Sequence, residues 1–288
     1  MKAMKEIKFP SMLSMDYPNL VSEALAACME VPYGERFMVD LTDLQKVSAF
    51  GVAALGARVA WLIRAKRMPT GSVVRRPESG RASNDLMRMG LYSLLQDASV
   101  GVYQKDMDQR PQELWLVDDP ADLPNACTRL INLLRSVLPA SDQNFERVQE
   151  MLGGLSDNVF RHAKSSTGAM LCAQAFPKAG VVEFAVADTG QGIWSSLKRF
   201  APFAESLQGD AHAILTALTL KVGSTGGATR PGFLNTLVAT ARKAQGEFVC
   251  MSGEAALSLR NGELRTIATP HFPGTVVGMR LRLFAKDE

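Results

Sequence analysis

Two polar stretches of the sequence carry side chains that can bind a small planar ligand. LSDNVFRHA contains Asn158, and DTGQG begins about thirty residues later at Asp188. An aspartate at a strand end can accept a hydrogen bond from an exocyclic amine, and Gly190 and Gly192 let the backbone approach a flat ligand closely. Taken alone, DTGQG is equally well explained as a simple turn. Together with the asparagine stretch it predicts a nucleotide pocket.

The asparagine stretch belongs to a predicted helix that begins near residues 141–144, all of which are suitable helix caps. Apolar residues three or four positions apart should face the core: Phe145, Val148, Leu152, Leu155 and Val159. A second stripe, with one turn between successive members, consists of Glu150, Gly154, Asn158 and His162. This stripe can face a ligand or solvent. The pair Gly153 and Gly154 suggests a close approach to the helix, because each glycine costs roughly 1 kcal/mol against alanine.

The two stretches together resemble the ATP-binding domain of the GHKL superfamily, which includes DNA gyrase, heat-shock-90-type chaperones, histidine kinases and mismatch-repair ATPases. The resemblance covers about residues 112–285 and is nearest to histidine kinases and anti-sigma serine kinases. It implies ATP and Mg²⁺ as cofactors. Asn158 matches the asparagine that coordinates magnesium, and Arg161 lies where many relatives have a basic phosphate contact. Asp188 matches the aspartate that binds the adenine amino group, with Gly190 and Gly192 lining the base.

The same resemblance extends to two later segments. KVGSTGGATRPGF is similar to the lid and glycine motif that cover the phosphates, and its glycines are Gly223, Gly226, Gly227 and Gly232. Gly232 would begin the next helix, whose free backbone N–H groups suit an anion. FPGTVVGMRLRLF looks like the closing strand of the domain. There Gly274 and Thr275 match the Gly-Thr pair behind the adenine.

Two departures from the family pattern argue against intrinsic catalysis. The family motif begins with a glutamate four residues before the asparagine, but here that position is Gly154, which has no side chain to accept a proton. Glu150 is one further turn away, too far to substitute. In the lid, Pro231 lacks an N–H that could hold a phosphate. Arg230 either replaces that contact or is a solvated charge. No catalytic residue is assigned, and hydrolysis should be slow.

The first half of the chain alternates predicted strands and helices. Strands are expected at RFMVDL and SVVRR, and helices at VSAFGVAALGARVAWLIRAKR and ASNDLMRMGLYSLLQ, where Gly90 marks a stop. This order resembles the STAS domain, the sulfate-transporter and anti-sigma-antagonist module, over roughly residues 30–97. Where phosphorylated relatives carry their acceptor serine, this chain has Ala49, so phosphorylation at that position is excluded. For Ser48, capping of the following helix is favoured over modification.

The polar segment QKDMDQRPQE, residues 104–113, is the best candidate for a linker. The predicted fold class is therefore α/β with two domains. A STAS-like α/β domain should cover residues 1–108. A GHKL domain should cover residues 109–288, as an α/β sandwich with helices on one face of a mixed sheet.

The composition narrows the possible partners. The 32 basic residues are balanced by 29 acidic ones, so nucleic acid is not expected. Four widely separated cysteines predict reduced core thiols and no zinc or redox site. The most apolar window, residues 47–63, contains Arg58 and is shorter than the roughly 20 residues that span a bilayer, so it predicts a buried helix and no membrane contact. With no signal peptide expected, the predicted location is cytoplasmic.

These features predict an ATP-binding regulatory protein that controls contacts with an unidentified protein partner, with a homodimer possible. The alternative is an anti-sigma-type serine/threonine kinase or a slow ATPase that receives a base from a partner. A third reading is a scaffold whose pocket binds no nucleotide. An autophosphorylating sensor kinase is disfavoured, because none of the three histidines lies in a phosphoacceptor pattern.

Overall fold

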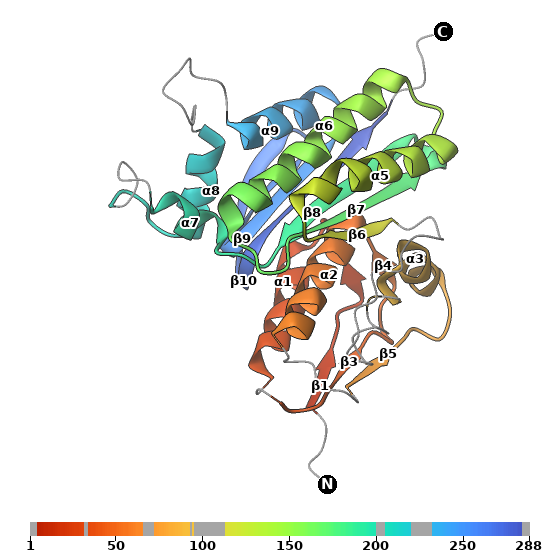
Figure 1. Ribbon diagram of the computed structural model, residues 1–288, viewed down its shortest axis with the longest axis vertical. Helices are drawn as coiled ribbons and strands as arrows, with labels where there is room; N and C mark the ends of the chain where they lie inside the picture. Colours follow the sequence, from red (N-terminus) through yellow and green to blue (C-terminus); the bar gives the residue numbers. More distant parts are fainter. Residues whose placement is uncertain are drawn as a thin grey trace.

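The computed structural model describes residues 5–31, 34–65, 72–92, 94, 113–199, 205–219 and 232–283. These residues form a mixed α/β structure (Figure 1). The predicted linker lies outside them except for Glu113, and the boundary between residues 108 and 109 stays a prediction.

A five-stranded sheet forms the centre of the second half. Its spatial order is β6 (Leu114–Val117), β7 (Ala169–Phe176), β8 (Val181–Asp188), β10 (Glu263–Arg282) and β9 (Glu247–Arg260). Every neighbouring pair is antiparallel, so the expectation of a mixed sheet was wrong. The pair β9–β10 is a hairpin closed by a tight turn. Asn261 and Gly262 both have positive φ, as the type I′ hairpin turn between β9 and β10 requires.

Both faces of this sheet are buried, and successive residues of its strands enter two different cores. On β7, Leu171 joins the core beneath α5 (Leu123–Val137), α6 (Asp142–Asn158) and α9 (Phe233–Lys243), whereas Met170 and Cys172 join the opposite core. This alternation follows from the two-residue repeat of a strand. Helices of the second half therefore cover one face (Figure 1).

The described residues of the first half include a parallel sheet and several helices. The sheet has the order β1 (Lys5–Lys8), β3 (Phe37–Asp40) and β5 (Val73–Arg75), and a short second pair joins β2 (Met12–Leu13) to β4 (Lys46–Val47). The helices include α1 (Pro18–Ala27), α2 (Ala49–Arg64) and α3 (Arg81–Met89). The predicted strands and helices are confirmed at β3, β5, α2 and α3. Gly90 ends α3 in the left-handed conformation, with φ of 85°.

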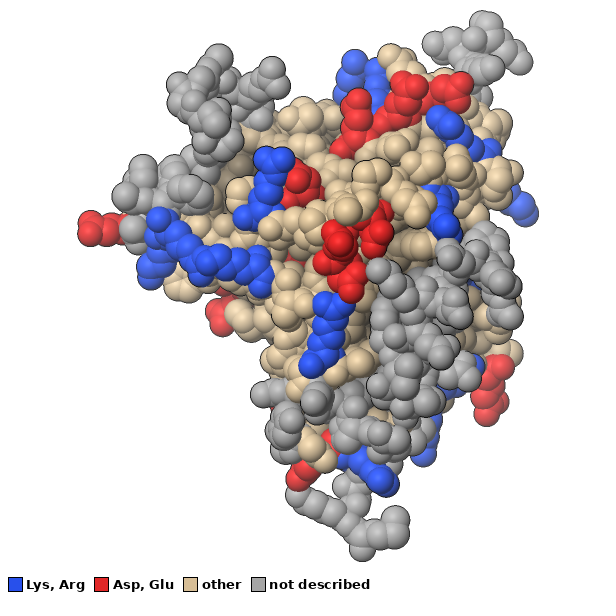
Figure 2. Space-filling view, viewed as in Figure 1, with Lys and Arg blue, Asp and Glu red and all other residues tan. Residues whose placement is uncertain are grey.

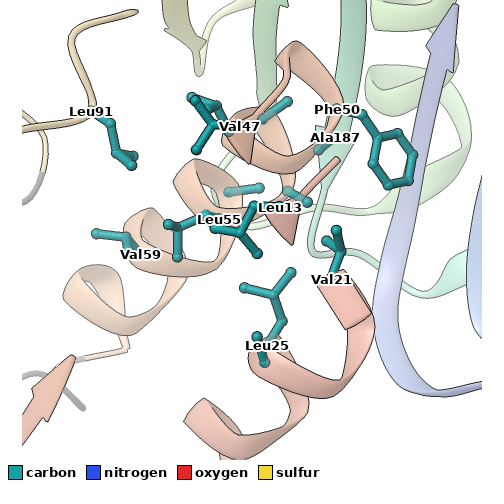
Figure 3. Packing of buried hydrophobic residues seen from close by; sticks show 14 of the residues in the cluster. Leu13, Val21, Leu25, Val47, Phe50, Leu55, Val59, Leu91 and Ala187 are labelled. Atoms are coloured by element: carbon teal, nitrogen blue, oxygen red, sulfur yellow. The ribbon is translucent and has the colours of Figure 1, made fainter. Parts of the chain in front are cut away.

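Helices α1 and α2 of the first half cover the second face of the five-stranded sheet. Figure 3 shows Phe50 and Leu55 of α2, Val21 and Leu25 of α1 and Ala187 of β8 in one apolar cluster. The sheet therefore carries helices on both faces, and the expectation of helices on one face holds only within the second half. The two halves share a continuous core.

A buried charge network joins the two halves at the edge of this core. Arg280 lies 2.9 Å from Glu183, 2.6 Å from Glu247 and 3.1 Å from Asp16. Glu183 is fully buried and also accepts a hydrogen bond from the backbone N–H of Phe50 on α2. Burial opposes ionisation of Asp16, but hydrogen bonds from Lys46 and Arg280 outweigh it and hold the pKa of this carboxyl well below its usual range. The network fixes the first half against the sheet.

Ser48 occupies the position before α2 but does not cap the helix with its hydroxyl. Its Oγ instead accepts a hydrogen bond from the backbone N–H of Met15 at 3.3 Å. The expected capping role was therefore wrong, because the buried hydroxyl accepts from Met15 and makes no cap hydrogen bond to the helix.

Basic and acidic side chains are distributed together over the visible face of the molecule (Figure 2). In the part of the chain that the structure describes, no helix is long and apolar enough to cross a membrane. The window around Arg58 is instead the buried helix α2, as predicted.

Candidate functional site

The site is built where the end of α6 meets the end of β8. Asn158 is the last residue of α6, and the chain continues as a π-helix over Val159–Ala163. The sequence predicted an ordinary helix through this segment. π-helical turns widen a helix locally and are frequent at functional sites. Lys164 then leaves the helix with φ of 53°.

Asp188 ends β8 with its carboxyl group buried, at 3% exposure. Its Oδ1 accepts a hydrogen bond of 2.7 Å from the backbone N–H of Gly190. Burial raises the pKa of Asp188 to about 7, although backbone hydrogen bonds from Gly190 and Thr275 act in the opposite direction. Thr275 is the partner of Asp188 across the β8–β10 ladder. A ligand amine that donates to this carboxyl would stabilise its ionised form.

The glycine turn after Asp188 is hydrogen bonded to the π-helical segment that follows α6. The backbone N–H of Gln191 donates to the carbonyl of Ala163 at 2.8 Å, and its Nε2 donates to the carbonyl of His162 at 2.6 Å. Gly190 packs so closely that an added Cβ would lie 2.1 Å from the Ala163 oxygen. The two stretches singled out from the sequence are therefore brought together.

Ser252 is hydrogen bonded to the residues that follow and face the glycine turn. The sequence did not predict this role. Its hydroxyl accepts a hydrogen bond from Ile193 N–H and donates one to the Gly274 carbonyl, both at 2.9 Å. Gly192 and Gly274 have positive φ, and a Cβ on Gly274 would lie 2.1 Å from the Asp188 carbonyl oxygen. The only available signal was a polar residue within the apolar run FVCMSGEAAL.

Arg161 lies on the π-helical turn with an exposed side chain. Its Nε donates to the carboxylate of Asp157 at 2.9 Å, one turn earlier on the helix. A role in phosphate binding would require Arg161 to exchange this surface ion pair for the ligand. That role stays a prediction.

An aromatic ring packs closely against Gly154, the position at which the GHKL pattern has its glutamate. A Cβ at this position would lie 2.3 Å from Cζ of Phe233, the first residue of α9. The close approach suggested by the glycine pair is found here, whereas a Cβ on Gly153 would meet nothing within 4 Å. Glu150 is exposed and borders a groove between α5 and α6.

The lid glycines Gly226 and Gly227 lie outside the described residues, together with Gly223, Arg230 and Pro231. Gly232 precedes α9 as its N-cap residue, as predicted, and adopts φ of −56° and ψ of 150°. The free N–H groups of the first turn of α9 thus follow directly after the predicted lid.

The four cysteines are buried free thiols, as predicted, and burial raises the pKa of the Cys127 thiol to about 11. Within the described ranges, no group of three or more His, Cys, Asp or Glu residues could hold a metal ion. A magnesium ion at this site would therefore depend on Asn158 and the nucleotide phosphates.

Neither a protein-family model nor a curated protein matches this chain.

Proposed function

We propose that this chain is an ATP-binding regulatory protein in which a nucleotide bound beside Asp188 controls contacts with a protein partner. The proposal includes a GHKL-type nucleotide domain in the second half and a STAS-like first half. One observation carries it: the Asp188 carboxyl is buried at a strand end beside a glycine turn that is hydrogen bonded to the end of the asparagine helix. An adenine amino group can donate to that carboxyl.

The Asn158 amide, at the end of α6, would supply the proposed magnesium contact. Gly190, Gly192 and Thr275 would surround the base, and Gly226, Gly227 and Gly232 would cover the phosphates with Arg161. ATP and Mg²⁺ are therefore the proposed ligands. ATP with Mg²⁺ would bind one of two conformations of the chain more tightly than the other. Binding would therefore shift the population toward that conformation, which is the regulatory signal.

The packing of Phe233 against Gly154 favours binding over catalysis. An enzyme of this type needs a carboxylate near the attacking nucleophile, and the aromatic ring fills the space that such a side chain would need. The kinase or ATPase alternative therefore requires a base from another molecule. Rapid phosphate release from labelled ATP by the purified chain, or transfer to a partner serine, would contradict the binding-only proposal.

Calorimetric titration with ATP and Mg²⁺ tests the nucleotide site. Asp188→Asn should weaken ATP binding by about 1.5 to 3 kcal/mol, or tenfold or more, because a charge-assisted hydrogen bond is lost. Asn158→Ala should chiefly remove the magnesium dependence of binding. Asp142→Asn, at the exposed opposite end of α6, is the matched control and should leave the affinity unchanged. An unaltered Kd in Asp188→Asn would refute the adenine assignment.

A further inference from the structure

A cavity of about 780 Å³ lies beside the glycine turn, and it is separate from the Asp188 carboxyl. It is enclosed by α7 (Gly192–Leu197), the first turn of α8 (Asp210–Thr219) and facing parts of β9 and β10. We call it the hairpin cavity. Its size is within the range of sites that bind small organic molecules, roughly 300 to 1,000 Å³.

The hairpin cavity exists because the β9–β10 ladder is interrupted there. The register shifts between Ala268 and Phe272 and again between Phe272 and Thr275, so the strand bends away from its partner. Gly209 and Gly253, with φ of 96° and 62°, line the same cavity in conformations that favour glycine. Irregular backbone thus forms part of the wall of the hairpin cavity. A regular β9–β10 pair would fill this space.

Among the described residues that line the hairpin cavity, the ionisable ones are Asp210, Glu254 and His271, and none is Lys or Arg. Asp210 is held in place because its Oδ2 accepts a hydrogen bond of 2.9 Å from the backbone N–H of Glu254. The Glu254 side chain is exposed. The two carboxylates therefore repel phosphates and carboxylates, and they attract a cation.

The remaining lining is suited to the body of an organic molecule. Trp194 contributes an indole ring, and Ala255, Ile267 and Ala268 contribute apolar surface. The Nζ of Lys198 lies 5.0 Å from the centre of the Trp194 ring, so this ring already accommodates a cation of the chain itself. The combination is typical of recognition of an amine or amidine that carries a planar or apolar group.

We propose that the hairpin cavity binds a small organic cation, with its charged group against Glu254 and Asp210 and its body against Trp194. This site shares the wall formed by Gly190 and Gly192 with the proposed nucleotide site but uses neither Asp188 nor Asn158. It does not rest on the proposed function, and it can be measured without nucleotide.

The test uses benzamidine as the probe on the full-length, nucleotide-free protein. Calorimetry or ligand-observed NMR should detect one site for benzamidine in the millimolar range or tighter. Benzoate, which has the same ring and the opposite charge, should not bind at the same concentrations. Absence of benzamidine binding, or equal binding of the two compounds, would overturn the proposal.

Two variants locate the bound probe. Glu254→Gln should weaken benzamidine binding about fivefold, because it removes one attractive charge and keeps the shape of the side chain. Ala268→Phe should abolish binding by filling the cavity without changing its charge. Glu23→Gln, on the exposed surface of α1, is the control and should bind like the wild type. Circular dichroism checks that the variants are folded. Undiminished binding in both cavity variants would show that the probe binds elsewhere.

Discussion

Asp188 combines two properties that conflict in the protein without ligand. Its carboxyl group is almost completely buried, which disfavours the charge, yet it accepts hydrogen bonds that favour it. Burial dominates and raises the pKa from 3.8 to about 7. The group thus changes its charge near neutral pH, where a bound amine would shift it to the ionised form.

The raised pKa of Asp188 predicts a pH-dependent stability. Between pH 4 and pH 7 the folded chain keeps a proton that the unfolded chain has lost, so the free energy of unfolding should decrease as pH rises through this range. Denaturant unfolding at pH 5 and pH 8, without nucleotide, measures the decrease. Asp188→Asn does not titrate and should show a shallower decrease. Equal pH dependence in the two proteins would contradict the raised pKa.

Arg58 is a buried charge that lacks an acidic partner among the described residues. It is 1% exposed, its Nη1 contacts the Met29 sulfur at 2.9 Å, and its Nε and Nη2 have no hydrogen-bond partner in the described structure. Burial lowers the pKa of this guanidinium to about 10. The rings of Trp61 and Phe272, at 5.6 and 5.8 Å, compensate only in part.

Arg58→Met should therefore stabilise the protein. An apolar side chain of similar length fills the same space without an uncompensated charge, and such replacements stabilise by about 1 to 3 kcal/mol. Thermal or denaturant unfolding measures the difference. Arg64→Met, on the same helix, is the control. Arg64 is half-exposed and bonded to Asp118 and the Ser166 carbonyl, so its loss should change stability by less than about 1 kcal/mol. A less stable Arg58→Met would mean that the guanidinium has a partner that the described residues do not supply.

Among single residues, the sequence predicted those that belong to a contiguous motif. Asp188, Gly190 and Gly192 could be selected because the strand end and the glycines are adjacent in the chain. Ser252 could not, because its contacts with Ile193 and Gly274 depend on strands that are distant in the sequence. The same reason applies to Ser48, whose partner Met15 is 33 residues away in the sequence.

At the scale of elements, the contact between α6 and α9 depends on the absence of a side chain at Gly154. The Phe233 ring occupies the position of a Cβ on Gly154, whereas Gly153 has open space beside it. The glycine pair thus predicted a close approach, but only the folded structure identifies the partner as a helix of the same chain. The π-turn after Asn158 was equally invisible in the sequence, since a change of hydrogen-bond register leaves no pattern in residue types.

A glutamate introduced at position 154 should damage this helix contact. Gly154→Glu should lower the free energy of unfolding by roughly 1 to 3 kcal/mol or more, because the new side chain overlaps the Phe233 ring. It should also fail to create ATP hydrolysis, measured as phosphate release. Gly153→Ala is the adjacent control and should be neutral or stabilising by up to about 1 kcal/mol. A stable Gly154→Glu protein that hydrolyses ATP would show that the ring can move aside.

At the scale of the whole molecule, the five-stranded sheet is completed only by the first half of the chain. The strands alternate between two buried faces, and α1 and α2 bury the second face. The sequence predicted several elements, among them β3, α2 and α6, because helical and strand periodicity are local, but it did not predict β1, α1 or β9. It did not predict that the halves share a core, because both faces of β7 and β8 are apolar and the sequence does not say which helices cover each face.

The shared core also constrains how the protein can act as a switch. Pro270 and Phe272 of β10 contact the first half, through the Ser22 hydroxyl and the Arg58 guanidinium. Two residues further on, Gly274 packs against Asp188. The irregular segment of β10 therefore connects the proposed nucleotide site to α1 and α2 physically. A nucleotide signal that passes between the halves would change this packing, and complete separation of the halves is not required.

The second half on its own should be unable to remain a soluble monomer. A chain of residues 109–288 would expose the sheet face that includes Met170, Cys172, Ala185, Ala187, Val249, Met251 and Val276. Glu183 would lose the Phe50 N–H, and Arg280 would lose Asp16. An exposed apolar face of this kind promotes association. Light scattering should therefore show aggregates, and an apolar dye should bind strongly.

The complete chain should, by contrast, unfold in one transition. Trp61 lies in the first half against the shared core, and Trp115 lies in the second half against the core on the other face of the sheet, so each ring reports on its own half. Fluorescence of two variants, one with Trp61 and the other with Trp115 as its single tryptophan and both without Trp194, should give coincident denaturant midpoints. Supplying residues 1–108 as a separate chain should reduce dye binding by the second half, since α1 and α2 can then cover the sheet. Two separate midpoints, together with a monomeric second half that binds no dye, would show that each half has a sufficient core of its own.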